Sequence, residues 1–186
     1  MPAYKAPLRD MRFLIDEVFD FHGSYAANGA EDATPDTVSA ILEEGAKFCE
    51  QVLAPLNRSG DEEGCHFNDG VVVTPQGFKE AFAQVKEGGW TGLDCDPDYG
   101  GQGMPYLMQC AVGEMLCGAN TAFTMYTGLT LSAAELILEL GTEEQKQKYV
   151  PKMLSGEWTG TMCLTEPHAG SDVGSASSAA TRNADG

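Results

Sequence analysis

The chain has 186 residues, enough for one domain and the start of a second. Lysine and arginine number 11 and aspartate and glutamate 28, so the formal net charge is −17. A chain this acidic is not expected to bind nucleic acid or an anionic membrane surface, because phosphate groups would repel it. No apolar run reaches the ~18 residues of a membrane span, since Glu135 and Glu139 interrupt the best candidate.

Targeting segments and metal sites are not predicted either. The first residues lack an apolar core with a small-residue cleavage site, so a cytoplasmic protein is expected. The six cysteines include no Cys-x-x-Cys pair, and the three histidines complete no familiar metal-ligand spacing. Cys49, Cys110 and Cys117 fall on apolar helical positions, which are typical of core thiols.

Residues 1–33 are interpreted as a helical arm and a linker. Apolar side chains recur at spacings of three and four between Pro7 and Phe21, which predicts a short helix. The small and polar residues over 23–33 are typical of a linker. The arm is expected to pack on the rest of the chain.

Residues 34–156 are predicted to form a helical domain. Thr34 and Pro35 have the pattern of an N-cap followed by a first-turn proline, and they begin the clearest helix. Pro55 lacks the N–H that would continue this helix. We therefore expect the helix to bend or end there, with a charged loop over 57–64.

The middle of this domain contains a turn pattern, a second helix-start pattern and a glycine-rich loop. A tight turn is expected at Asp69-Gly70, and Thr74 with Pro75 is expected to begin another helix. The glycines and aspartates over 90–104 predict an ordered loop, because they complete neither an EF-hand nor the G-x-G-x-x-G pattern of a nicotinamide site.

Three further helices complete the domain. The segments 105–117 and 120–140 are apolar almost all round, as buried helices are. Thr142 with Gln145 has the pattern of a capping box, which predicts a last helix as far as about Leu154.

A strand and a turn of small residues follow. The stretch 158–165 has strand-like composition, and Pro167 would end it. As a lone strand, it is expected to pair with another chain or to keep its ladder groups solvated. Ala169, Gly170 and Ser171 have minimal side chains, so a ligand could approach their backbone N–H groups closely. By pattern alone, this is either a surface turn or a cofactor cradle.

Three motifs, in order, resemble the acyl-CoA dehydrogenase family. The sequence Cys-Leu-Thr-Glu-Pro-His-Ala-Gly-Ser-Asp over 163–172 resembles the family signature C-[VL]-T-E-P-x-A-G-S-D. Residues 96–105 resemble its P-E-x-Y-G-G-x-G loop, and residues 140–151 resemble its G-[ST]-x-x-Q-[KR]-x-x-[YW]-L-P helix. The arm over 4–14 is similar to the methylthiopropionyl-CoA dehydrogenase-like and AidB-like subgroup.

The resemblance implies a mainly α fold class, with the family's N-terminal helical bundle followed over 157–186 by the first strand of a truncated β-domain. It implies FAD as cofactor, an acyl-CoA substrate, electron-transferring flavoprotein as partner and a homo-oligomeric parent protein. In this family a carboxylate removes the α-proton of the thioester, and a hydride passes from the β-carbon to flavin N5. The base is a glutamate of the C-terminal domain, so no catalytic residue is expected here and the fragment is expected to be inactive.

The resemblance also implies cofactor-binding residues. Met162, Leu164 and Thr165 match the strand that lies along the flavin ring. Gly170 and Ser171 match the turn near the cofactor's phosphates, and Ser171 also matches a position on the acyl-CoA side.

Residues 123–127 match the region that lines the family's acyl-chain pocket, with Phe123, Thr124 and Thr127 as candidates for substrate binding. Alternatively, the threonines pack and bond back to helix carbonyls. His168 stands where a glycine is common, which is costly if the turn needs a positive φ.

Two other functions stay open. A non-catalytic helical interaction module would use the helices only to present a surface to a protein partner. An AidB-like, DNA-associated flavoprotein would keep the flavin, but the net charge of −17 disfavours DNA contact by this part.

Overall fold

The computed structural model describes residues 3–184, which form helices and one β-hairpin. The helices and strands, in chain order, are α1 (Leu8–Arg12), a π-helical turn (Phe13–Val18), α2 (Phe21–Ala27), α3 (Pro35–Phe48), a second π-helical turn (Cys49–Leu53), α4 (Ala54–Glu63), β1 (His66–Asn68), β2 (Val71–Val73), α5 (Phe78–Glu87), α6 (Tyr106–Leu140) and α7 (Glu143–Leu154). Short 3-10 turns cover Pro97–Tyr99 and Val173–Ser175. The mainly α fold class is confirmed.

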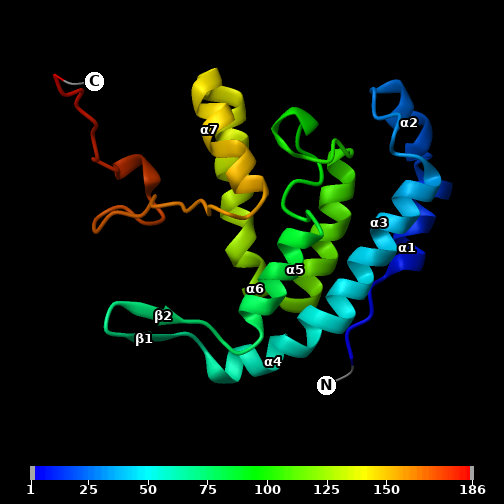
Figure 1. Ribbon diagram of the computed structural model, residues 1–186, viewed down its shortest axis with the longest axis horizontal. Coiled ribbons are helices and arrows are strands. Elements are labelled where there is room, and N and C mark those ends of the chain that lie inside the picture. Colours follow the sequence, from blue (N-terminus) through cyan, green and yellow to red (C-terminus); the bar gives the residue numbers. More distant parts are fainter. Residues whose placement is uncertain (1–2, 185–186) are drawn as a thin grey trace.

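The elements are arranged around α6 (Figure 1). Helix α7 lies along the last turns of α6, and α3 packs against the first half of α6. The arm of α1 and α2 lies on the outer side of α3, while the β1–β2 hairpin and the C-terminal segment project from the bundle.

The main core lies between α3, the second π turn, α5 and the first half of α6. Its fully buried side chains include Leu42, Leu53, Met108, Val112 and Met115. Burying one such side chain contributes roughly 1.5–3 kcal/mol. Gly45 allows α3 and α6 to approach, since a Cβ there would lie 3.1 Å from Cε of Met115.

A smaller core joins α7 to the end of α6, where Val150, Met153 and Leu154 are buried. The predicted capping box is confirmed at the start of α7. The N–H of Gln145 donates to Oγ1 of Thr142 over 3.3 Å, and the N–H of Thr142 donates to Oε1 of Gln145 over 2.8 Å.

The sequence predicted that the helix beginning at Pro35 would bend or end near Pro55, and the structure has a π turn just before this proline. The π turn Cys49–Leu53 comes first, and α4 then continues to Glu63, so the expected loop over 57–64 is mostly helical. The π turn adds a residue to the hydrogen-bonded ring and shifts the register. Pro55 therefore falls in the first turn of α4, where its missing N–H costs little.

The arm also differs from the prediction. The single helix expected over 7–21 is divided by Asp20, whose φ of 46° is left-handed. Helix α2 then includes residues 23–27, which had been assigned to a linker. Met11 and Ile15 are buried, and α1 packs against α3.

The hairpin turn is where the sequence predicted it, because Asp69 and Gly70 both have positive φ, as a two-residue turn requires. Helix α5, in contrast, begins at Phe78, not at Thr74 and Pro75. Its first turn packs against α4: a Cβ on Gly60 would lie 2.6 Å from the Phe78 ring.

The two helices expected over 105–117 and 120–140 are joined as α6, with a break at Asn120 (φ −160°, ψ 86°). The side chain of Asn120 is buried. Its Oδ1 accepts from the N–H of Phe123 over 3.0 Å, and its Nδ2 donates to the carbonyl of Leu53 over 3.3 Å. Asn120 therefore caps the second half of α6 and ties it to the π turn.

Helix α6 is less buried than its composition predicted, since Met125 and Leu136 are exposed. Cys110 and Cys117 are exposed too, which corrects the expectation of core thiols, whereas Cys49 is buried as expected. In the part of the chain that the structure describes, no helix combines the length and the apolar character needed to cross a membrane.

The break in α6 gives a first prediction. Asn120→Ala should lower the free energy of unfolding by about 1–3 kcal/mol, because it removes a cap and leaves the Leu53 carbonyl without that donor. Urea unfolding followed by circular dichroism measures the change. The matched variant Glu139→Ala, at an exposed position of the same helix, should cost about 0.5 kcal/mol or less. Equal losses in the two variants would contradict the role of Asn120.

The burial of the thiols gives a second prediction. Burial raises the pKa of Cys49 to about 12 and that of Cys95 to about 11. Since the thiolate is the nucleophile, neither should react with iodoacetamide at pH 8 until the chain unfolds. The thiols expected to react in the folded chain are those of Cys65, Cys110, Cys117 and Cys163. Peptide mass spectrometry identifies the labelled positions, and rapid labelling of Cys49 would argue against this core.

Candidate functional site

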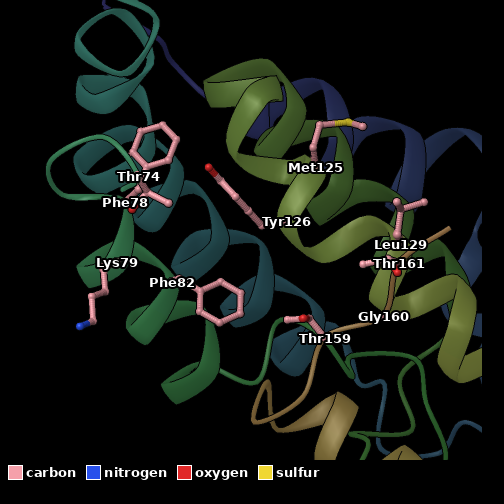
Figure 2. A pocket seen from close by; sticks show the side chains of 10 residues that line it. All are labelled: Thr74, Phe78, Lys79, Phe82, Met125, Tyr126, Leu129, Thr159, Gly160 and Thr161. Atoms are coloured by element: carbon pink, nitrogen blue, oxygen red, sulfur yellow. The ribbon is translucent and has the colours of Figure 1, made fainter. Parts of the chain in front are cut away.

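A groove of about 470 Å³ opens between α5, the second half of α6 and the segment 159–161 (Figure 2). Its apolar wall consists of Phe78 and Phe82 from α5 and Met125, Tyr126 and Leu129 from α6. Gly160 and the threonines on either side of it close one side. The ammonium group of Lys79 points away from the rings in Figure 2, so the groove has an apolar interior.

An aromatic cluster forms the end of the groove nearest the hairpin. The ring centroid of Phe78 lies 5.5 Å from that of Phe123 and 6.1 Å from that of Tyr126, with the rings edge to face. Such contacts make the wall rigid. The Tyr126 hydroxyl lies 3.6 Å from Sγ of Cys65, and burial raises the pKa of Tyr126 to about 12. Tyr126 is therefore neutral at physiological pH.

The predicted substrate-binding residues of α6 are not at the surface of this groove. Phe123 is only 1% exposed and lies beneath it, in contact with Phe78. The hydroxyl of Thr124 donates to the carbonyl of Thr121 over 2.7 Å, and that of Thr127 donates to the carbonyl of Thr124 over 3.2 Å. The threonine hydroxyls therefore bond back to helix carbonyls, as the alternative interpretation of these residues expected.

Other residues of the groove lie outside the three sequence motifs. Neither Leu129 nor Phe82 was a candidate in the sequence. The signal that could have identified them is the contact between α5 and α6, which brings together segments about 45 residues apart in the sequence.

The predicted flavin strand leaves the bundle at the groove. The N–H of Gly160 donates to Oγ1 of Thr130 over 3.1 Å, and Met162 and Leu164 beyond it are 58% and 50% exposed. Within residues 3–184, the N–H groups over 162–165 have no hydrogen-bond partner. In the described part of the chain, no second strand lies beside residues 158–165, and the exposed residues 162–165 leave their N–H groups to solvent.

A tight turn follows, in which the N–H of Glu166 donates to the carbonyl of Ala169 over 3.0 Å and the reverse bond measures 3.1 Å. His168 does not have a positive φ, so replacing the common glycine by histidine causes no backbone strain at this position. Gly170 and Ser171 come next and are exposed. A Cβ on Gly170 would meet no heavy atom within 4 Å, so the described residues leave its backbone open to approach.

The carboxylate of Glu166 is enclosed by donors from further along the chain. It accepts from the N–H groups of Ser177 and Ser178, each over 2.9 Å, and these bonds lower the pKa of Glu166 to about 2. Nε2 of His168 lies 3.1 Å from Oγ of Ser177 and 3.4 Å from Glu166. One ring nitrogen faces both partners, so these residues do not form a Ser-His-acid proton relay.

The aspartate-rich loop over 90–104 folds on itself. The N–H of Gln102 donates to the carbonyl of Gly92 over 2.8 Å, and that of Gly103 donates to the carbonyl of Cys95 over 2.9 Å. A Cβ on Gly101 would lie 2.0 Å from the Cys95 carbonyl oxygen, so close packing explains this glycine. Among residues 3–184, no three histidine, cysteine or carboxylate side chains converge as metal ligands.

The arrangement agrees with comparisons to known proteins. Residues 35–157 match the acyl-CoA dehydrogenase N-terminal domain. The 3-methylmercaptopropionyl-CoA dehydrogenase of Ruegeria pomeroyi is 36% identical over 171 residues, which cover 92% of this chain and 29% of that protein.

Solved structures give the same picture. Glutaryl-coenzyme A dehydrogenase in its glutaryl-CoA complex has a TM-score of 0.64 at 30% identity, over 77% of this chain and 35% of that chain. Butyryl-CoA dehydrogenase from Megasphaera elsdenii has a TM-score of 0.63 at 28% identity, over 75% of this chain and 35% of that chain. The chain belongs to the acyl-CoA dehydrogenase family, as the three motifs predicted. It spans about 29% of the length of the curated relative.

Tyr126 gives a third prediction. In a spectrophotometric titration of the folded chain, a tyrosine component should ionise near pH 12, and Tyr126→Phe should abolish it. The unfolded side chain ionises near pH 10, so the stability that depends on the neutral ring is complete below pH 10 and is lost as pH rises toward 12. If the variant lost no absorbance change near pH 12 relative to the wild type, the raised pKa of Tyr126 would be contradicted.

Proposed function

We propose that this chain is the N-terminal part of an FAD-dependent acyl-CoA dehydrogenase that introduces the α,β double bond of an acyl-CoA thioester. The observation that carries the proposal is the exposed stretch 162–171, which begins beside the apolar groove. Family membership supports the reaction class. Because the chain spans about 29% of its relative, the activity is that of a longer protein.

The residues of the stretch fit a flavin nucleotide. Met162 and Leu164 present exposed apolar side chains, and the backbone N–H groups between them lack partners within residues 3–184. An apolar face with free donors suits a flat ring with polar edges, and the donors over 162–165 would hold it. The open backbone at Gly170 and the exposed Ser171 suit phosphate oxygens. When bound, the flavin supplies the hydride acceptor, and the protein supplies binding and orientation.

The groove suits an acyl chain. Phe78, Met125 and Leu129 would contact its methylene groups, and Phe123 would support them from below. Thr124 and Thr127 would not contact the acyl chain with their hydroxyls, because these are already bonded to helix carbonyls. They would affect the groove only through the shape of α6. The burial of each methylene is worth about 0.8 kcal/mol, so the depth of the groove would select chain length.

The base that removes the α-proton is not among the residues of the groove, since none of its lining side chains is a carboxylate. This supports a base from another part of the parent protein, and an inactive fragment. An electron-transferring flavoprotein as electron acceptor and a homo-oligomeric parent are the partners we propose by family resemblance.

A second candidate, a helical interaction module without flavin, is favoured by the hairpin. Phe67 and Val72 form a cross-strand pair in which both side chains are exposed, at 72% and 62%. An isolated two-stranded hairpin is marginally stable in water, so a partner surface would stabilise it.

The colour of the full-length protein separates the two functions. A dehydrogenase should purify with bound flavin, and its visible absorption should bleach on addition of a suitable acyl-CoA. A colourless full-length protein that does not take up added FAD would overturn the dehydrogenase proposal and favour the interaction module.

A fourth prediction concerns chain length. Leu129→Trp in the full-length enzyme should fill part of the groove and lower kcat/KM for longer acyl chains by about tenfold relative to shorter ones. Leu136→Trp is the matched control, because Leu136 is exposed on the same helix and does not line the groove. Steady-state kinetics over a series of acyl-CoA lengths measure the ratio. An identical length profile in the two variants would place the acyl chain elsewhere.

A further inference from the structure

We propose that Glu166 is a positioning residue, whose carboxylate closes the loop 167–176 and thereby holds Gly170 and Ser171 in place for the cofactor. The inference rests on the proposed flavin site. The Glu166 side chain does not itself contact the ligand. It holds the shape of the loop whose residues do.

The closure consists of bonds between the two ends of the loop. Oε2 of Glu166 accepts from the N–H of Ser177 over 2.9 Å and from its hydroxyl over 3.3 Å. Oε1 accepts from the N–H of Ser178 over 2.9 Å. Both carboxylate oxygens are thus engaged, and the Glu166 side chain is only 14% exposed. Bonds from N–H groups to an ionised acceptor are about twice as strong as those between neutral groups.

Each half of the loop is ordered by its own short contacts. The exchange of bonds between Glu166 and Ala169 fixes the first half and buries Ala169. The hydroxyl of Ser175 donates to Asp172 over 2.5 Å in the second half. These contacts are local, so they do not determine how the two halves lie relative to each other. The Glu166 carboxylate joins them.

Gly170 and Ser171 lie at the junction of the two halves. Neither has a hydrogen-bond partner within residues 3–184, and both are exposed. Glycine has more conformational freedom than any other residue, so the backbone here would vary widely if the ends of the loop were free. Closure reduces this freedom before the ligand arrives, which lowers the entropic cost of binding.

His168 supports the closure from the solvent side. Its Nε2 lies 3.1 Å from Oγ of Ser177, the same hydroxyl that donates to Glu166. When the hydroxyl donates to Glu166, its oxygen accepts from the His168 ring N–H. With Nε2 protonated, the imidazole orients the hydroxyl toward the carboxylate, and the donors run from His168 through Ser177 to Glu166.

The test compares Glu166→Gln with Glu139→Gln in the full-length protein. Glu139 is exposed on α6, and its side chain has no hydrogen-bond partner among residues 3–184, so it is the matched control. Glu166→Gln should weaken FAD binding by about tenfold and speed amide exchange at residues 177 and 178 by a similar factor, since the charged acceptor is lost. Glu139→Gln should change neither, and without FAD the melting temperature should stay the same in both variants. A Ser177→Ala variant, which keeps both N–H donors, should lose less affinity than Glu166→Gln.

Fluorescence titration with FAD and hydrogen exchange give separate outcomes. Unchanged exchange at residues 177 and 178 in Glu166→Gln would overturn the closure. Faster exchange with unchanged FAD affinity would overturn the positioning role and leave the proposed function intact. A wild-type protein that binds no FAD would overturn both.

Discussion

The hydrogen bonds of Asn120 are the constraint on which the rest of the arrangement depends. They end one helix, begin the next and tie the junction to the carbonyl of Leu53 in the second π turn. The second half of α6 carries one wall of the groove and the surface on which α7 packs. One buried amide therefore determines where the main core, the groove and the smaller core lie relative to one another.

The sequence predicted those parts of the fold that local signals specify. The capping box at Thr142, the turn at Asp69-Gly70 and the break near Asn120 each depend on a few neighbouring residues, and each lies where it was predicted. The loop expected over 57–64 was wrong, because α4 continues past Pro55 as far as Glu63. A π turn leaves no simple pattern in a single sequence, since it depends on how α3 and α4 pack on other helices.

The stretch proposed to bind the flavin could be predicted from the sequence, whereas the groove could not. The stretch 162–171 is continuous, so its motif placed all the proposed flavin-binding residues on one exposed segment. The groove is assembled from helices far apart in the sequence, and the motif-based candidates on α6 lie one or two positions from the residues that line it. Two positions along a helix turn a side chain by about 200°, so Phe123 lies beneath the wall that Met125 helps to form.

The second π turn also makes the chain between α3 and α4 unusually tolerant of losing one residue. The wide turn over Cys49–Leu53 holds one residue more than an α-helical turn, so removal of a single residue there would restore ordinary helical bonding while α4 keeps its direction and phase. Gly60 would still face the Phe78 ring, which lies close against it. The same deletion within regular α3 would instead rotate everything beyond it by about 100° and separate Gly60 from Phe78.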